Sequence, residues 1–212
     1  MIGRIGTLIA GLALLLGMLP PGTAAAQPAA QEEGRTFVGD IAGLENIGAK
    51  FVVVVGPERR AVAFLGSRDD DFNRGNAKWY IGNVGGNTLA AVAADGTPLV
   101  LTLQGNTVTG TLAGGQVTAT LTQTGTAGLY RTSVSPTETH VAIVAPDGSW
   151  VGMAVNPVTN QIIRTWNSGT GVVERVADTT AIRVRPEPQA LPQQLELVSW
   201  DRFGAWCSDW WC

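Results

Sequence analysis

Residues 88–122 alternate between threonine and apolar side chains, and this alternation constrains the fold more than any other feature of the chain. A period of two residues places successive side chains on opposite faces of a β-strand. Three dipeptides interrupt the stretch at near-equal spacing: Asp95-Gly96, Gly105-Asn106 and Gly114-Gly115. Each pair can adopt the positive φ angles of a two-residue hairpin loop. The pattern therefore predicts an antiparallel up-and-down sheet.

Counting outward from these loops, and from a further loop at Gly85-Gly86, predicts the register of the sheet. The expected pairs are Trp79 with Val92, Val92 with Leu99, Leu103 with Val108, and Leu112 with Val117. In this register the leucine and valine side chains share one face, and the threonines share the other. A slip of one residue would mix the two faces, so the sequence specifies the register strongly.

Residues 1–26 have the composition of a secretory signal peptide. Arg4 precedes an uncharged apolar run over residues 5–19, and Ala24 and Ala26 form an A-x-A cleavage site. Cleavage after Ala26 would leave a mature chain that begins with a flexible lead-in, residues 27–34. The apolar run is short for a membrane span, although an uncleaved N-terminal anchor is the alternative.

The distribution of charge argues against a nucleic-acid partner. The net charge is −3 at pH 7, and the arginines are scattered rather than clustered. Between Lys78 and Arg131 the only charged residue is Asp95. A long, uncharged, Thr- and Gly-rich β segment suits a secreted, periplasmic or cell-surface protein, and we expect no membrane span in the mature chain.

The rest of the chain extends the β prediction. Residues 50–55 form a continuous β-branched run, which indicates a strand buried on both faces, and further short strands follow at the spacing of a barrel or sandwich. We predict an all-β fold over residues 35–183, an up-and-down antiparallel meander closing into a barrel or a two-sheet sandwich. No amphipathic helix is evident. Residues 184–194 read as a Pro-rich linker, and residues 195–212 as a short aromatic tail.

The polar excursion at residues 66–77 contains the sharpest candidate metal site. Asp69, Asp71 and Asn73 lie at alternate positions, as oxygen ligands do at the start of a calcium loop. The match to an EF-hand then fails, because Gly75 comes one place late and Tyr80 replaces the closing glutamate. The alternative is an ordinary solvated loop. Calcium is the only cofactor that the sequence suggests.

Catalytic motifs are weak throughout the chain. His140 is the only histidine and lies within a predicted strand, where packing or a hydrogen bond explains it more simply than catalysis. No G-x-S-x-G elbow and no nucleotide-binding loop before a helix is present. A carboxylate pair of the glycosidase type is assembled by the fold and has no sequence signature.

The last 18 residues are rich in tryptophan and contain both cysteines. We expect a disulfide between Cys207 and Cys212, because paired thiols are typical of exported proteins. The aromatic side chains either pack over an open end of the sheet or form a docking surface for a sugar, a protein or a membrane interface. These candidate binding residues are Trp200, Phe203, Trp206, Trp210 and Trp211.

Three functional hypotheses follow. The first is a non-catalytic binding module of the cell envelope, with an apolar or aromatic-lined cavity for a small apolar or carbohydrate ligand, or a surface for an envelope protein. The second is an extracytoplasmic hydrolase that uses a carboxylate pair, with Asp69 to Asp71 as candidates. The third is a purely structural envelope protein with a filled core.

Overall fold

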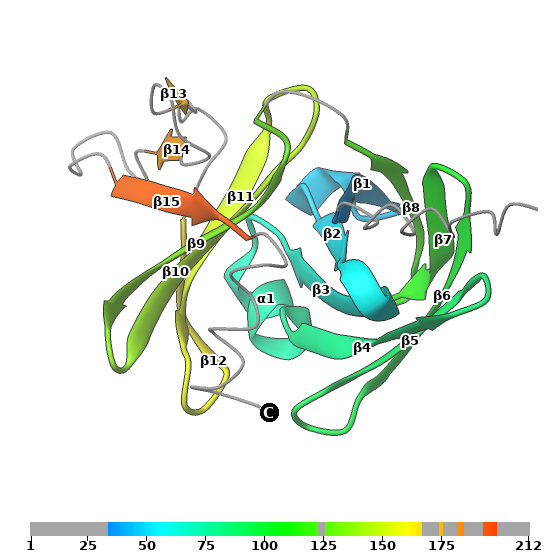
Figure 1. Ribbon diagram of the computed structural model, residues 1–212. Helices are drawn as coiled ribbons and strands as arrows, with labels where there is room; N and C mark the ends of the chain where they lie inside the picture. Colours follow the sequence, from blue (N-terminus) through cyan, green and yellow to red (C-terminus); the bar gives the residue numbers. More distant parts are fainter. Residues whose placement is uncertain (1–33, 123–125, 167–173, 176–181, 185–192, 199–212) are drawn as a thin grey trace, which may run out of the picture. The chain divides into compact units, whose positions relative to one another are not determined.

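The computed structural model describes residues 34–122, 126–166, 174–175, 182–184 and 193–198 (Figure 1). Within these ranges eight antiparallel strands close into a barrel, in the order β1 to β8. Seven further strands form a second sheet in the order β12-β11-β10-β9-β15-β14-β13. This architecture confirms the predicted all-β class and the up-and-down meander. No helix in the described ranges is both long and apolar enough to cross a membrane.

The barrel strands follow one another along the chain and are joined mostly by short turns. They are β1 (Arg35–Ala42), β2 (Lys50–Val55), β3 (Arg60–Gly66), β4 (Trp79–Gly85), β5 (Thr88–Ala93), β6 (Pro98–Gln104), β7 (Thr107–Leu112) and β8 (Gly115–Leu121). Two 3-10 turns, η1 (Glu45–Ile47) and η2 (Pro57–Arg59), and one helix, α1 (Asp70–Asn76), connect the first four strands. The last strand pairs with the first, with Phe37 opposite Leu121, and this pairing closes the barrel.

The second sheet continues the hairpin pattern. Its strands are β9 (Gly128–Ser135), β10 (Glu138–Val144), β11 (Trp150–Asn156), β12 (Gln161–Trp166), β13 (Glu174–Arg175), β14 (Ile182–Val184) and β15 (Gln193–Leu197). β15 pairs with β9, with Glu196 opposite Arg131, and its Leu195 is fully buried. The boundary that we drew between residues 194 and 195 therefore falls inside a strand of this sheet.

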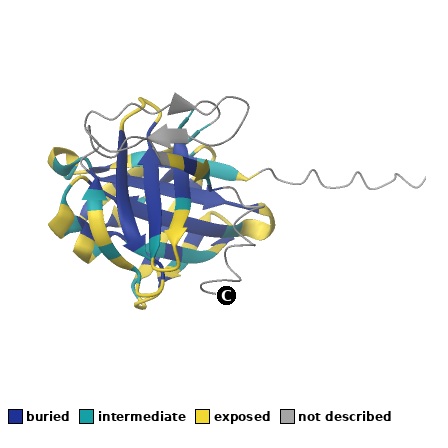
Figure 2. Ribbon diagram, turned by 90° about the vertical axis from the view of Figure 1, so that its left-hand side faces the viewer, coloured by how far each residue is buried: buried dark blue, intermediate teal, exposed yellow. Residues whose placement is uncertain are grey.

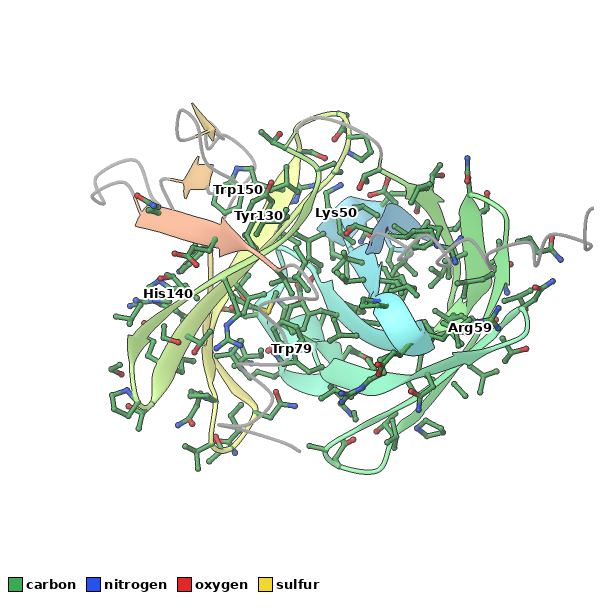
Figure 3. All side chains as sticks on the ribbon, viewed as in Figure 1. Lys50, Arg59, Trp79, Tyr130, His140 and Trp150 are labelled. Carbon is green, nitrogen blue, oxygen red and sulfur yellow. The ribbon has the colours of Figure 1, made fainter. Side chains whose placement is uncertain are left out.

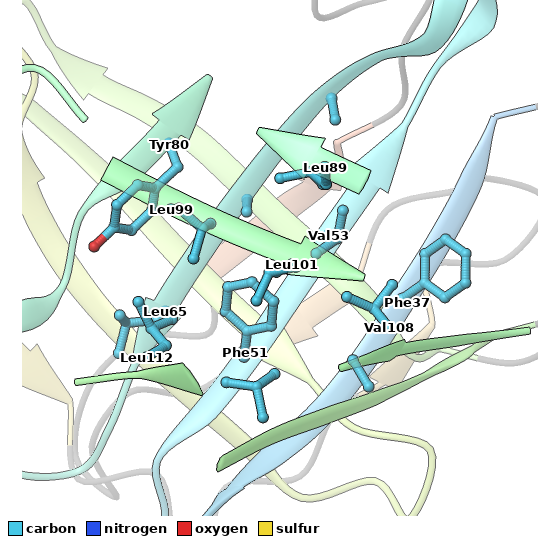
Figure 4. Close-up of a cluster of buried hydrophobic side chains, with 14 of the residues drawn as sticks. Phe37, Phe51, Val53, Leu65, Tyr80, Leu89, Leu99, Leu101, Val108 and Leu112 are labelled. Atoms are coloured by element: carbon cyan, nitrogen blue, oxygen red, sulfur yellow. The ribbon is translucent and has the colours of Figure 1, made fainter. Parts of the chain in front are cut away.

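Apolar side chains fill the interior of the barrel (Figure 4). Every second residue of each strand points inward, as the alternation of threonine and apolar residues predicts. Large side chains in this interior include those of Phe37, Ile41, Phe51, Leu65, Tyr80, Leu89, Leu99 and Leu101, and each is at most 2% exposed. In its described part the barrel interior is therefore a packed core and not the apolar ligand cavity that a binding module would place there.

The predicted register is correct around Gly105-Asn106, where Leu103 lies opposite Val108. It is wrong by one residue around Asp95-Gly96, because the loop there has three residues and not two. Val92 therefore pairs with Pro98, points outward and is 51% exposed. One residue of slip exchanges the two faces of a strand.

Two other turns were also misplaced. The turn between β4 and β5 is Gly86-Asn87, so Ile81 and not Trp79 lies opposite Val92. The turn between β7 and β8 is Ala113-Gly114, which pairs Leu112 with Gly115 instead of Val117. This last error is two residues, so it leaves the inward and outward faces as predicted.

A second core lies between the outside of the barrel and one face of the second sheet. Val52 and Val54 of β2 and Phe64 of β3 pack there with residues of β10 and β11, including Ile143 and Met153. β2 is consequently buried on both of its faces, as its continuous run of valines indicates. Figure 2 shows buried residues along the strands in the middle of the view, and exposed residues at the turns and on parts of other strands.

Candidate functional site

A hollow of about 140 Å³ lies at the end of the barrel where β1 begins and β2 ends. Its lining combines two arginines, three apolar side chains and the turns that follow β4 and β6. We call this end the barrel mouth, and the lining residues are Arg35, Val55, Arg59, Val84, Gly86, Asn87, Leu103 and Gly105. These residues come from β1, η2 and three strand ends that only the closure of the barrel brings together.

The lining has an apolar part and a polar part. Val55, Val84 and Leu103 belong to the last layer of the interior core, and each is no more than 6% exposed. Gly86 and Gly105 open the two turns with φ angles of 56°, a conformation that suits glycine and leaves the backbone uncovered. The hollow therefore presents mainly polar groups, and its apolar contact surface consists of the small exposed parts of these three side chains.

Arg35 occupies an inward position of β1, two residues before the buried Phe37. Its guanidinium carbon lies 5.6 Å from the centre of the Phe37 ring. A cation over an aromatic face is attracted to it, and the contact limits the side chain's freedom. Arg35 therefore points into the end of the barrel and not into bulk solvent.

Arg59 lies in a strained loop. The Gly56 N–H donates to the Arg60 carbonyl at 2.9 Å, which closes a three-residue loop, Pro57 to Arg59, between β2 and β3. Glu58 and Arg59 have φ angles of 61° and 59°. Non-glycine residues rarely adopt this left-handed conformation. Figure 3 places Arg59 on the barrel and His140 on the second sheet.

Two other loops of the chain have the same length and the same closing hydrogen bond. Ala93 donates to Thr97 at 2.9 Å, and Ala145 donates to Ser149 at 2.8 Å. In both loops the third residue is a glycine with positive φ, 83° at Gly96 and 81° at Gly148. Arg59 takes the place that glycine fills in its two counterparts.

The opposite end of the barrel, which we call the closed end, is covered by apolar side chains. Leu44, Ile47, Phe72 and Ala113 pack against the interior core there. The Lys78 ammonium lies 2.6 Å from the Asp95 carboxylate and fixes the β5–β6 loop to the start of β4. Hydrogen bonds from Lys78 and then from Thr97 hold the pKa of Asp95 well below its ordinary value.

The candidate calcium residues form the start of α1. The Asp69 carboxylate accepts a hydrogen bond from the Phe72 N–H at 2.7 Å, as an N-cap residue does. Asp71 pairs with Arg74 one turn later. The fully buried Asn73 side chain accepts from the Ser67 N–H and donates to the Thr165 hydroxyl.

The excursion that we predicted as a loop is thus a capped helix, and Asp69 and Asn73 have structural roles. Across the described parts of the chain, no group of three or more His, Cys, Asp or Glu side chains is placed to hold a metal ion. The calcium site stays a prediction. The structure gives the three neighbouring aspartates separate partners, since Asp70 accepts from the Thr165 N–H at 3.1 Å.

His140 is buried in the second sheet, on the face that points away from the barrel. Its Nε2 lies 2.6 Å from the Glu138 carboxylate, which also accepts a hydrogen bond from Arg164 at 2.9 Å. The His140 and Trp166 rings form a T-shaped pair, with ring centres 4.6 Å apart. Burial lowers the pKa of Arg131, which lies on β9 opposite Val141, to about 10. These contacts describe a histidine held in place by packing and hydrogen bonds.

The predicted disulfide and the aromatic docking residues lie outside the described residues. They are Cys207, Cys212, Trp200, Phe203, Trp206, Trp210 and Trp211. The signal peptide, residues 1–26, and the Pro-rich stretch at 185–192 lie outside them as well. These assignments stay predictions.

No family model, curated protein or solved structure matches the chain. The function of the site is therefore inferred from its geometry. Sequence analysis did not single out Arg35 or Arg59. The one available signal was the three-residue break at Pro57 to Arg59, which lacks the glycine that a loop of this length favours.

Proposed function

We propose that the protein is an exported, non-catalytic binding module whose recognition site is the barrel mouth. The observation that supports this function is the hollow itself, which lies at one end of a barrel whose described interior is packed with apolar side chains. Binding sites commonly combine an apolar lining with a few polar groups that orient the ligand. The mouth has both features. Val55, Val84 and Leu103 provide the apolar lining, and the two arginines provide the polar groups.

Export is supported by the sequence of residues 1–26, with its single basic residue, apolar run and A-x-A site. The outward positions of β5 to β8 are consistent with it, because they carry threonine, glutamine and small apolar residues in place of charges.

A blocking variant tests the proposal. Asn87 is the second residue of the Gly86-Asn87 turn and lines the hollow, whereas Asn106 occupies the same place in the Gly105-Asn106 turn and does not. Asn87→Tyr should fill the mouth, and Asn106→Tyr is the matched control. Their melting temperatures would be recorded with benzoate, inorganic phosphate, benzylamine and N-acetylglucosamine as probes.

The proposal predicts that at least one probe raises the melting temperature of the wild type and of Asn106→Tyr but not of Asn87→Tyr. A ligand bound to the folded state alone must stabilise it in this way. Equal shifts in both variants would place binding elsewhere on the molecule. No shift with any probe would favour the purely structural hypothesis, which predicts a barrel that binds none of them.

A further inference from the structure

The charges around the hollow identify a class of ligand, an inference that rests on the proposed binding function. We infer that the barrel mouth binds the carboxylate group of a small organic acid between Arg35 and Arg59. The apolar part of that ligand lies against Val55, Val84 and Leu103. The site takes one planar oxyanion on two guanidinium groups.

The sign of the charge reverses locally at the barrel mouth. The whole chain has a net charge of −3, yet the residues that line the hollow include two arginines and no acidic residue. Neither arginine forms an ion pair with a carboxylate in the described ranges. The guanidinium group presents parallel N–H donors that match the two oxygens of a carboxylate. Two such groups at one hollow therefore favour an anion over a neutral or cationic ligand.

The backbone conformation of Arg59 is unfavourable for an arginine. Its two counterparts in loops of the same length are glycines, which adopt positive φ without steric conflict. An arginine at that position costs stability, and the described packing around the loop offers no compensation, since η2 contains no buried residue. Strained residues concentrate where a side chain serves a ligand. Contact with a ligand accounts for an arginine where glycine would make a more stable loop.

The Arg35 side chain is already ordered at the barrel mouth. Its contact with the buried Phe37 ring holds the guanidinium in the end of the barrel before any ligand arrives. Groups that are already ordered lose less conformational entropy on binding. The volume of about 140 Å³ sets the size of the ligand. A cavity of this order accommodates a benzene-sized group.

The test uses three probes that share a phenyl ring: benzoate, its neutral counterpart of equal size benzamide, and the larger phenyl phosphate. Their dissociation constants would be measured by NMR titration of the secreted protein and of R35Q, R59Q and R60Q. Arg60 is the matched control because it neighbours Arg59 but does not line the hollow. Melting temperatures would establish that each variant is folded.

We expect benzoate to bind the wild type and R60Q alike and to bind R35Q and R59Q about tenfold more weakly, the size of one lost charged hydrogen bond. Benzamide should bind the wild type about tenfold more weakly than benzoate does. Equal affinity for benzoate and benzamide, or an unchanged affinity in R59Q, would overturn the inference. Tighter binding of phenyl phosphate than of benzoate would overturn the carboxylate assignment.

The two proposals fail in different ways. Suppose that a neutral probe binds R35Q and R59Q as tightly as the wild type but does not bind Asn87→Tyr. The proposed binding site would then stand, and its selectivity for carboxylates would be disproved. Probes that bind the wild type and Asn87→Tyr equally would remove the binding site itself. Raising the salt concentration provides an independent test. Screening should weaken the binding of benzoate and leave the binding of benzamide unchanged.

Discussion

At one end of the barrel Leu44, Ile47 and Phe72 pack against the interior core, whereas at the other end Arg35 and Arg59 line a hollow. The closed end uses glycine where its β5–β6 loop needs positive φ, and an ion pair holds that loop in place. The mouth places an arginine at the matching position of its β2–β3 loop. The same barrel strands lead to both ends, so the fold alone does not require different residues in the two loops. The closed end also holds a non-glycine residue at positive φ, Ala113 with φ 51°, so the contrast is between the two matched loops. In that pair the closed end uses the residue that favours stability, and the mouth gives up stability for exposed, ordered charge.

The largest expected effect tests the core that both ends share. Phe51 is fully buried in the barrel interior, and Phe51→Ala should lower the free energy of unfolding by about 3–5 kcal/mol. Val100→Ala is the control, because Val100 is 62% exposed and its loss should change stability by less than about 0.5 kcal/mol. Urea unfolding measures both. Similar losses in the two variants would contradict a packed barrel.

The next effect probes the closed end. Asn73→Ala removes hydrogen bonds to both backbone groups of the buried Ser67 and to Thr165 of β12. Leaving buried groups unpaired should cost about 2 kcal/mol, measured in the same unfolding experiment. Asn83→Ala at an exposed position of β4 should be nearly neutral. A neutral Asn73→Ala would mean that the helix α1 does not fasten this end.

A smaller effect on the free energy of unfolding is expected when the loop residue of the mouth is placed in the loop of the closed end. Gly96→Arg gives the closed-end loop the residue that the mouth has, and the left-handed conformation should make it about 1 kcal/mol less stable. Space is not the cause, since a Cβ at Gly96 would have no neighbour within 4 Å. Gly85→Arg, where space is also open and φ is ordinary, should be close to neutral. Equal losses in both variants would remove the conformational explanation.

The smallest effect concerns the ion pair of the closed end. Because the pKa of Asp95 is lowered in the folded state, its ionised form adds stability above the unfolded value of about 3.9 and loses it as the pH falls further. Asp95→Asn should therefore melt slightly below the wild type at pH 7. The gap should close as the pH falls from about 4 toward 2, and calorimetry at several pH values would follow it. A gap independent of pH would point to lost hydrogen bonds alone.

The period of two residues was sufficient to predict the barrel faces wherever the loop length was correct, as at Leu103 and Val108. It failed at Val92 because the Asp95 side chain accepts a hydrogen bond from the Thr97 N–H at 3.0 Å and stabilises a three-residue loop. Dipeptide counting cannot distinguish that loop from a two-residue turn. A single residue in the loop then decides which face of β5 is buried.

The candidate site was beyond sequence analysis for a different reason. Arg35 and Arg59 lie in separate strands and loops, and Val84 and Leu103 come from still later strands. Only the pairing of β1 with β8 brings these four positions around one hollow. The aspartates at 69–71 attracted attention because they are adjacent in sequence, yet their side chains cap and brace a helix.

Arg59→Gly tests the central claim most directly, because it gives the mouth the residue that both counterpart loops have. Its free energy of unfolding and its affinity for benzoate would be measured on the same preparation. The account predicts a protein that is up to about 1 kcal/mol more stable and binds benzoate about tenfold more weakly. A less stable protein, or one that binds benzoate as the wild type does, would contradict the claim that the mouth sacrifices stability for a ligand.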